Sequence, residues 1–243
     1  MGKAENSLEN HCRELDRLGK SDFRRRVLRT LVSRHLLPGK TLDLGCGYGH
    51  LSMELARRGH PVTAVDISPT MIESLRARAH GLPLRAETMA AEEIDRLSDG
   101  SFMNIVSLDV LEHISEDARL LRTLFNLLHE GGRLVLVVPA VPRLFGRRDI
   151  MLGHHRRYSR ADLRRKIMSA GFAIERLRFW NATALLPYLF FEKVLRREIS
   201  DAPRINPGKA WRLVGAVLAG LLRLENRIAM PLGLSLFAVA RKP

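Results

Sequence analysis

Residues 42–49 have the sequence Leu42-Asp43-Leu44-Gly45-Cys46-Gly47-Tyr48-Gly49. A short apolar segment, 41–44, leads into a turn with glycine at every second position, and helical spacing of apolar residues begins at His50. Glycine adopts positive φ angles at little cost and lets a ligand lie against the backbone. The first turn of a helix adds free N–H groups and a partial positive charge. The segment therefore predicts a strand, a ligand-binding turn and a helix, in that order.

A second apolar segment, Val62–Val65, ends at Asp66, about 20 residues after the glycine turn, where a carboxylate can accept hydrogen bonds from ribose hydroxyl groups. Ser68 and Pro69 then supply a helix cap and a first helical residue. The glycines alternate, whereas a dinucleotide-binding loop has the spacing G-x-G-x-x-G, and position 50 is His. These features predict a ribose-containing cofactor with a negatively charged or carboxylate-bearing end.

Strand-like and helix-like segments alternate along the first 139 residues, which predicts an α/β fold with a parallel sheet and right-handed crossovers. The expected strands are 41–44, 62–65, 84–87, 102–108, 133–138, 172–180 and 234–240, and the expected helices are 5–36, 50–58, 69–80, 115–129 and 159–170. Residues 140–158 are expected to form a loop-rich connection. The segment 181–230 interrupts the pattern with two expected helices around a linker rich in Pro, Asn and Gly.

The composition fits one globular domain with an elaboration. The chain has 243 residues, of which 46% are hydrophobic and 27% charged, so wholesale disorder is excluded. We expect a single domain, 1–243, made of an N-terminal helical part (1–40), a cofactor-binding core (41–139) and an acceptor-side half (140–243).

The two cysteines, Cys12 and Cys46, exclude a disulfide framework. No apolar segment typical of a signal peptide is visible near the N-terminus, and the apolar runs 182–191 and 213–222 are shorter than the roughly 20 residues that a bilayer requires. We therefore expect a reducing, cytoplasmic location.

Four segments, in this order, resemble the class I S-adenosylmethionine-dependent methyltransferases. The glycine turn, preceded by Asp43, resembles their D-x-G-x-G-x-G loop, and Val65-Asp66-Ile67-Ser68 resembles their acidic second motif. The stretch Ser107-Leu108-Asp109-Val110-Leu111-Glu112-His113-Ile114 resembles their fourth-strand motif, and Gly131-Gly132-Arg133-Leu134 resembles the approach to their fifth strand.

The resemblance implies a Rossmann-like sheet of seven strands, mostly parallel with the last strand antiparallel, with helices on both faces and a helical insertion before the last strand. It implies S-adenosylmethionine as cofactor. Asp43 would organise the loop, Gly45 and Gly47 would approach the methionine part together with Cys46, and Asp66 would bind the ribose. The remaining implied contacts are Ile67 against the adenine, Glu87 or Thr88 near its amino group, and Leu108 on the methionyl side.

His113 follows the fourth strand at the cofactor edge of the sheet, where ligands of such folds bind. It is a candidate general base or acceptor-orienting residue. The alternative is that His113 caps the next helix or bonds to backbone.

A second candidate is Gly153-His154-His155-Arg156-Arg157-Tyr158-Ser159-Arg160. It resembles a Gly-His-x-Arg-Arg-Tyr sequence of many bacterial methyltransferases encoded among glycan, lipid and natural-product enzymes. Two imidazoles, two guanidinium groups and a phenol beside a helix start could bind a phosphate or carboxylate. His154 and Tyr158 are candidate catalytic residues, and His155, Arg156 and Arg157 are candidate substrate-binding residues; the alternative is a solvated basic loop.

The positive charge is unevenly placed. The net charge is +14, and Arg143–Lys166 contains nine Lys and Arg residues against two Asp and Glu residues. This segment follows the fifth strand, where the acceptor is expected to enter, so the charge favours an anionic acceptor or surface. An ordinary solvated face is the alternative.

The insertion 181–230 leaves several alternatives open. The aromatic-rich stretch 179–191 and the apolar run 213–222 have basic residues beside them. Such segments can lie in a membrane interface, form a lid over a lipid-like substrate, or pack on the core or on a second subunit. Peripheral membrane contact and a homodimer are therefore both open.

Three function classes follow. The leading one is a methyltransferase acting on a small, anionic or lipid-like acceptor. Asp109, Glu112 and His113, with His154 or His155, are also similar to the divalent metal site of small-RNA 3′-terminal 2′-O-methyltransferases, and the charge would suit RNA. However, Leu-Glu-His is common in metal-free relatives and no RNA-binding module is present, so we assign no metal ligands and do not expect nucleic acid as partner. The third class is a non-methylating cofactor-binding protein, a cyclase or scaffold, on the same fold.

Overall fold

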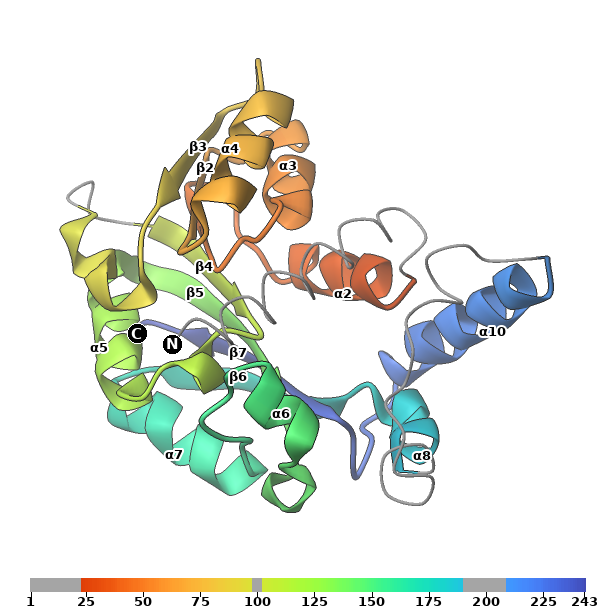
Figure 1. Ribbon diagram of the computed structural model, residues 1–243. Helices are drawn as coiled ribbons and strands as arrows, with labels where there is room; N and C mark the ends of the chain where they lie inside the picture. Colours follow the sequence, from red (N-terminus) through yellow and green to blue (C-terminus); the bar gives the residue numbers. More distant parts are fainter. Residues whose placement is uncertain (1–22, 98–101, 190–208) are drawn as a thin grey trace.

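The computed structural model describes residues 23–97, 102–189 and 209–243 (Figure 1). Its centre is a seven-stranded sheet with the order β3-β2-β1-β4-β5-β7-β6. All neighbouring strands are parallel except that β7 runs antiparallel to both β5 and β6. The strands are β1 Thr41–Leu44, β2 Val62–Asp66, β3 Leu84–Thr88, β4 Phe102–Leu108, β5 Leu128–Pro139, β6 Ala173–Trp180 and β7 Ser235–Arg241. The predicted Rossmann-like fold, with its last strand antiparallel, is confirmed.

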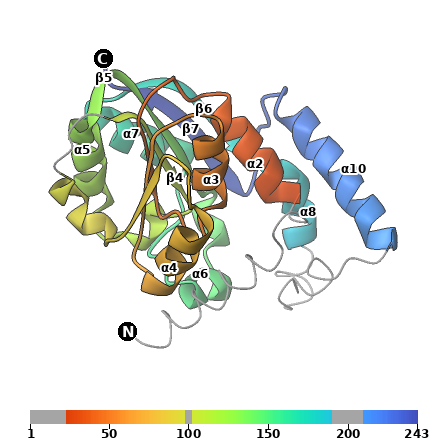
Figure 2. The ribbon, with the colours of Figure 1, turned by 90° about the horizontal axis from the view of Figure 1, so that it is seen from above.

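Helices cover both faces of the sheet. The longer helices are α2 Phe23–Ser33, α3 His50–Arg57, α4 Pro69–Arg78, α5 Asp117–Leu127, α7 Arg160–Ser169 and α10 Lys209–Glu225. The short ones are η2 Ala91–Arg96, η3 Leu111–His113, η4 Pro142–Leu144, α6 Arg147–Met151, η5 Ala182–Ala184 and α8 Leu185–Tyr188. Figure 2 shows α2 between α3 and α10 on one side of the sheet, with α5 and α7 on the other.

The sheet is buried on both faces, so each strand contributes to two cores. In β5, Leu134 and Leu136 pack in the core that includes residues of α5 and α7, whereas Val135 and Val137 pack in the core that includes residues of α2, α3 and α4. Successive side chains of a strand point to opposite faces, which explains why an almost continuous apolar run is required here.

The helix starts follow from local capping. Ser68 Oγ accepts a hydrogen bond from Met71 N at 3.4 Å, with Pro69 as the first helical residue of α4. Ser159 Oγ accepts one from Asp162 N at 3.0 Å at the start of α7. These caps satisfy backbone N–H groups that have no partner inside the helix, so both starts lie where the sequence predicts them.

Some element boundaries differ from the predictions. Helix α5 ends at Leu127 and β5 begins at Leu128, because Leu128 already pairs with Phe102 of β4. Residues 140–158 contain η4 and α6 as well as loop. Of the predicted helix 5–36, the structure describes α2, and residues 5–22 lie outside the described part, as does the linker of the insertion, 190–208.

The insertion contributes α8 and α10. Ala219 and Leu222 of α10 are buried in the core that includes α2, while Leu213 and Val217 are 69% and 56% exposed. The carboxylate of Glu225, at the end of α10, accepts hydrogen bonds from Ala182 N and Thr183 N, which fixes η5 against this helix. Among the described residues, no helix combines the length and the apolar character that crossing a membrane requires.

Candidate functional site

The turn between β1 and α3 is built from glycines that no other residue could replace without strain. Gly45, Gly47 and Gly49 have φ angles of 73°, 54° and 71°. A Cβ atom added at Gly45 would overlap Val110 Cγ2, which follows β4. Because the carboxyl ends of β1 and β4 are neighbours, the turn lies directly beside the segment that leaves β4. The backbone of the turn therefore has to lie in close contact with Val110, which only glycine permits. Such a turn is also expected where a ligand lies against the backbone.

Asp66 ties the second strand to this turn. Its Oδ2 accepts a hydrogen bond from Gly47 N at 2.8 Å, and its Oδ1 accepts one from Ser68 N at 3.0 Å. Burial raises the pKa of Asp66, and the hydrogen bonds from Ser68, Gly47 and Ile67 oppose the shift. Asp66 thus has the place that the sequence predicts for a ribose-binding carboxylate, at the end of β2 and in contact with the glycine turn.

Asp43 lies beneath the turn. It is buried, and its Oδ2 accepts a short hydrogen bond from Ser52 Oγ of α3. Burial raises the pKa of Asp43 to about 6; the Ser52 hydrogen bond opposes this and the charge of Asp66 adds to it. Since Asp43 joins β1 to α3, its position fits a residue that organises the loop.

The residues predicted to contact the adenine lie around the ends of β2 and β3. Strand pairing places Asp66 beside Thr88 and Val65 beside Glu87. Ile67 is 66% exposed, so its side chain is open to solvent and could serve as a platform for a flat ring. Leu108, which is predicted to lie on the methionyl side, is half-buried at the end of β4. Cys46 lies in the turn, and burial raises the pKa of its thiol.

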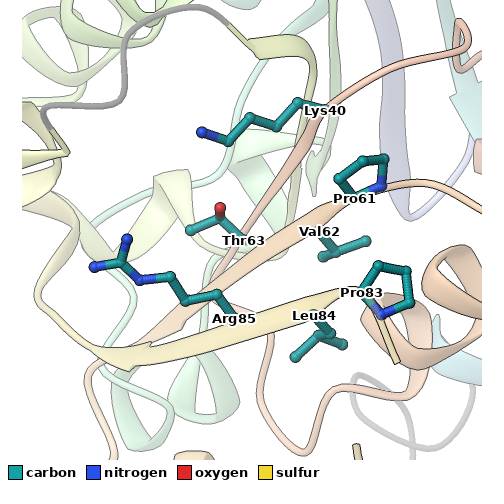
Figure 3. Close-up of a pocket in the computed structure, with 7 residues that line it drawn as sticks. All are labelled: Lys40, Pro61, Val62, Thr63, Pro83, Leu84 and Arg85. Atoms are coloured by element: carbon teal, nitrogen blue, oxygen red, sulfur yellow. The ribbon is translucent and has the colours of Figure 1, made fainter. Parts of the chain in front are cut away.

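A surface pocket lies at the opposite edge of the sheet (Figure 3). Lys40, Pro61 and Pro83 precede β1, β2 and β3, so the pocket lies at the amino ends of these strands. Ligands of open α/β sheets bind at the carboxyl ends. This pocket is therefore separate from the glycine turn.

The segment after β4 turns sharply into η3. Asp109 has a φ angle of 55°, and its N–H donates to Val137 O at 2.9 Å. Glu112 is fully buried, and neither of its carboxylate oxygens has a hydrogen-bond partner among the described residues. Burial raises the pKa of Glu112 well above its usual value, and Asp109 adds to the shift.

Asp149 organises the segment after β5. It is buried in α6, and its carboxylate accepts hydrogen bonds from Gly146 N, from His154 Nδ1 at 2.9 Å and from Arg157 Nε at 2.8 and 3.0 Å. Burial alone would raise its pKa, but His154 and Arg157 outweigh it and hold the pKa of Asp149 below its usual range. Arg157 also donates to Tyr188 Oη of α8 at 3.0 Å.

These two segments bring Glu112, His113 and His154 together, and we call them the Glu–His–His cluster. One donor atom from each side chain lies within 4.8 Å of the others. The imidazole rings of His113 and His154 meet edge to face, with centroids 4.7 Å apart, and His154 Nε2 lies 3.9 Å from Glu112 Oε1. Burial, with the neighbouring His154, lowers the pKa of His113 to about 4. His113 is therefore uncharged at neutral pH.

The position of Tyr158 argues against the catalytic role predicted for it. Its side chain is fully buried, and its hydroxyl lies 2.8 Å from Asp117 Oδ2 and 3.1 Å from Leu111 O. Burial and Asp117 raise its pKa far above the usual value. A phenol in this position joins α5 to the segment after β5, and is not available to an acceptor.

Arg156 and Arg157, which the sequence predicts to bind an anionic substrate, form ion pairs with acidic residues of the same chain. Arg156 lies 3.1 Å from Asp117 Oδ2, and Arg157 binds Asp149. His155 is exposed, and its N–H donates to Glu112 O at 2.8 Å. Asp117 and Asp149, the partners of these arginines, are not among the predicted site residues, although the position of Asp149, an acid within a basic segment, is a signal in the sequence.

The profile of a methyltransferase-domain family matches residues 15–177. The chain belongs to this family. It contains a methyltransferase domain, and the glycine turn with its exposed neighbour Ile67 fits the S-adenosylmethionine that the sequence motifs imply.

Ubiquinone biosynthesis O-methyltransferases are among the curated relatives of this methyltransferase. The protein of that name from Xanthomonas oryzae pv. oryzae (strain PXO99A) is 34% identical over 105 residues, which is 42% of this chain and 43% of the relative. The one from Xanthomonas campestris pv. campestris (strain B100) is 34% identical over 111 residues, 44% of this chain and 46% of the relative. The alignments thus span less than half of these relatives.

Solved structures share the fold of the methyltransferase over most of the chain. The putative methyltransferase in complex with the Haloferax volcanii Trm112 activator has a TM-score of 0.66 and 17% identity, with 97% of both chains covered. An S-adenosylmethionine-dependent methyltransferase from Mesorhizobium loti has a TM-score of 0.58 and 20% identity, with 84% of this chain and 91% of that chain covered. The [4+2]-cyclase SpnF has a TM-score of 0.59 and 23% identity, with 89% and 80% covered, so the fold is not restricted to methyl transfer.

Proposed function

We propose that this methyltransferase methylates a hydroxyl oxygen of a small amphiphilic acceptor with anionic or lipid-like character. The observation that carries the proposal is the position of the Glu–His–His cluster. The cluster begins two residues after Val110, and Val110 packs against the glycine turn that would hold the methionine part of the cofactor. S-adenosylmethionine supplies a methyl group activated on a sulfonium, so the protein has to orient the acceptor and accept its proton.

His113 is the residue best placed to accept that proton. Because its pKa is lowered to about 4, its imidazole is uncharged at neutral pH and has a free lone pair. The pKa of the buried Glu112 beside it is raised, because burial and the charge of Asp109 disfavour its ionised form. Asp149 fixes the ring of His154, so that His154 can orient the acceptor. These roles together support a hydroxyl acceptor over one that has no proton to lose.

The segment 142–151 supports an amphiphilic acceptor. Its buried Asp149 holds His154, while its outer surface exposes Ile150 and Met151, at 64% and 40%, together with Arg147. Apolar and basic side chains thus lie on one short segment next to the cluster. Such a surface would suit a molecule with an apolar body and an anionic group.

The named relatives give independent support. Their name assigns them O-methylation in ubiquinone biosynthesis, so their methyl group is transferred to an oxygen. A lipid-like acceptor would be met at a membrane surface, and the exposed apolar side chains of α10 offer a face for peripheral membrane contact or for a second copy of the chain; these are Leu213, Val214, Val217, Leu221 and Leu224.

Methyl transfer from labelled S-adenosylmethionine tests the proposal. The acceptor panel would contain an alkyl-chain phenol with a carboxylate, the matching amine, and single-stranded RNA. We expect label on the phenol, and a loss of about 100-fold in kcat for His113→Ala, as removal of a general base gives. The exposed His129, remote from the cluster in sequence, provides the control variant His129→Ala, which is expected to retain full activity.

Other outcomes would overturn the proposal. Label only on RNA would move the enzyme to the RNA class, and label only on the amine would exclude a hydroxyl acceptor. Tight binding of S-adenosylhomocysteine without transfer to any acceptor would favour a non-methylating role on this fold.

A further inference from the structure

We propose that Arg157 is a positioning residue for His154, and that its contact with Tyr188 makes the orientation of His154 depend on the docking of helix α8. The proposal rests on the proposed function, in which His154 orients the acceptor. Arg157 acts through Asp149, and its contact with Tyr188 joins two segments that are 31 residues apart in the sequence.

Asp149 holds the ring of His154. Its side chain is 1% exposed, and its carboxylate accepts a hydrogen bond from His154 Nδ1 at 2.9 Å. Because a carboxylate only accepts hydrogen bonds, this bond assigns the hydrogen of the imidazole to Nδ1 and leaves the lone pair on Nε2, the nitrogen 3.9 Å from Glu112 Oε1. A displaced Asp149 would therefore change both the tautomer of His154 and the direction in which Nε2 points.

Arg157 fixes Asp149 in turn. The Arg157 side chain is 7% exposed, and its Nε donates to both carboxylate oxygens of Asp149, at 2.8 and 3.0 Å. A guanidinium group is planar and its donors have fixed directions, whereas a lysine ammonium has no such geometry. Loss of the guanidinium would also remove a positive charge that balances this buried carboxylate. The position of Arg157 therefore sets the position of Asp149, and with it the ring of His154.

The second arm of Arg157 reaches the insertion. Its Nη2 donates to Tyr188 Oη at 3.0 Å, and Tyr188 is a buried residue at the end of α8. Helix α8 directly follows η5, which is fixed to the end of α10 because the carboxylate of Glu225 accepts hydrogen bonds from two backbone N–H groups of η5. A continuous series of contacts therefore leads from α10 through α8, Arg157 and Asp149 to His154.

A purely structural role of the same contacts would give a different result from a positioning role. If the contacts only join α8 to the segment after β5, removal of the Tyr188 hydroxyl lowers the stability and leaves kcat unchanged. If Arg157 positions His154, removal of that hydroxyl lowers kcat, and it does so only while His154 is present. A double-mutant cycle measures this dependence of one substitution on another.

A cycle of Tyr188→Phe and His154→Ala tests the coupling, with kcat for the formation of S-adenosylhomocysteine as the readout. We expect Tyr188→Phe to lower kcat about fivefold in the wild-type background, as loss of one hydrogen bond gives, and less than about twofold in the His154→Ala background. Arg157→Lys should lower kcat further, because lysine keeps the charge but has no second arm. The matched control is Tyr158→Phe, which removes a buried hydroxyl that bonds to Asp117; it should destabilise the chain and leave kcat unchanged.

Nuclear magnetic resonance of the imidazole nitrogens gives a readout that needs no acceptor. The histidines of the full chain would be labelled with ¹⁵N, and His154→Ala would assign the signals of His154. We expect one tautomer, with the hydrogen on Nδ1, in the wild type and in Tyr158→Phe, and a mixture of tautomers in Tyr188→Phe and Arg157→Lys. Tyr188→Phe keeps the aromatic ring, so it remains informative if Arg157→Lys does not fold.

The two readouts separate this proposal from the proposed function. Unchanged His154 signals in Tyr188→Phe, or an equal fall in kcat for Tyr188→Phe in both backgrounds, would overturn the positioning role of Arg157. Altered signals without methylation of any hydroxyl would leave the positioning role in place and overturn the proposed function. Hydroxyl methylation with unchanged signals would have the reverse meaning.

Discussion

The backbone N–H of Gly47 donates a hydrogen bond of 2.8 Å to Oδ2 of Asp66. Through this bond, the residue that ends β2 fixes the middle of the glycine turn that follows β1. The same carboxylate also caps the start of the next segment through Ser68 N. Asp66 and the glycine turn are therefore directly connected, so loss of Asp66 would affect both the predicted ribose contact and the shape of the turn.

Replacing Asp66 should weaken cofactor binding. Hydrogen bonds to charged groups contribute about 1.5–3 kcal/mol, so we expect Asp66→Ala to raise the Kd for S-adenosylhomocysteine about 10- to 100-fold in calorimetry. The control is Glu73→Ala, an exposed acid of the neighbouring helix α4. Equal Kd values for the Asp66 variant and the wild type would show that the carboxylate does not contribute.

Alanine variants of two glycines can distinguish the effect of a strained backbone conformation from the effect of a steric clash with a neighbouring side chain. Gly45 and Gly81 have similar φ angles, 73° and 77°, but an added Cβ would overlap Val110 at Gly45 and meet nothing within 4 Å at Gly81. Both alanine variants should lose about 1–2 kcal/mol of unfolding free energy from the left-handed conformation. Gly45→Ala should lose more in urea unfolding, and it alone should weaken S-adenosylhomocysteine binding. Identical behaviour of the two variants would refute the role of close approach.

Asp43 should make stability depend on pH. Its folded pKa of about 6 lies above the ordinary value of 3.8, so the folded state binds the proton more tightly than the unfolded state. Stability is therefore greatest where Asp43 is protonated, and it falls as pH rises through 6, by up to about 3 kcal/mol. Asp43→Asn should remove this component and be about 2 kcal/mol more stable than the wild type at pH 8, with little difference near pH 4. Parallel curves of unfolding free energy against pH for the two proteins would contradict the assignment.

Tyr158 should matter for stability and not for catalysis. Tyr158→Phe removes the hydrogen bond to Asp117, a net loss of about 1.5–3 kcal/mol for a bond to a charged group. We expect a lower midpoint in urea unfolding and an unchanged kcat for formation of S-adenosylhomocysteine. A fall in kcat at unchanged stability would restore the catalytic role that the burial of the phenol argues against.

Most of the fold could be predicted from the sequence because helix caps and turns depend on residues that are close together in the chain. Ser68 with Pro69, and Ser159 with Asp162, place helix starts through bonds that span three residues. The start of β5 could not be predicted from such local signals. Leu127 and Leu128 continue a helical pattern, but pairing of Leu128 with Phe102 of another strand turns the chain into the sheet.

The candidate site divides in the same way. The sequence by itself determined the glycine turn, Asp66 and the position of His113 after β4, because backbone conformation and strand order follow from short patterns of glycine and apolar residues. Only the tertiary structure decided that Glu112 meets His154, that Asp149 takes up Arg157, and that Tyr158 is buried against Asp117. A side chain's partners depend on which distant segments the packed core brings within bonding distance. The basic segment, which the sequence predicts to bind an anionic acceptor, therefore binds acidic side chains of its own chain in part.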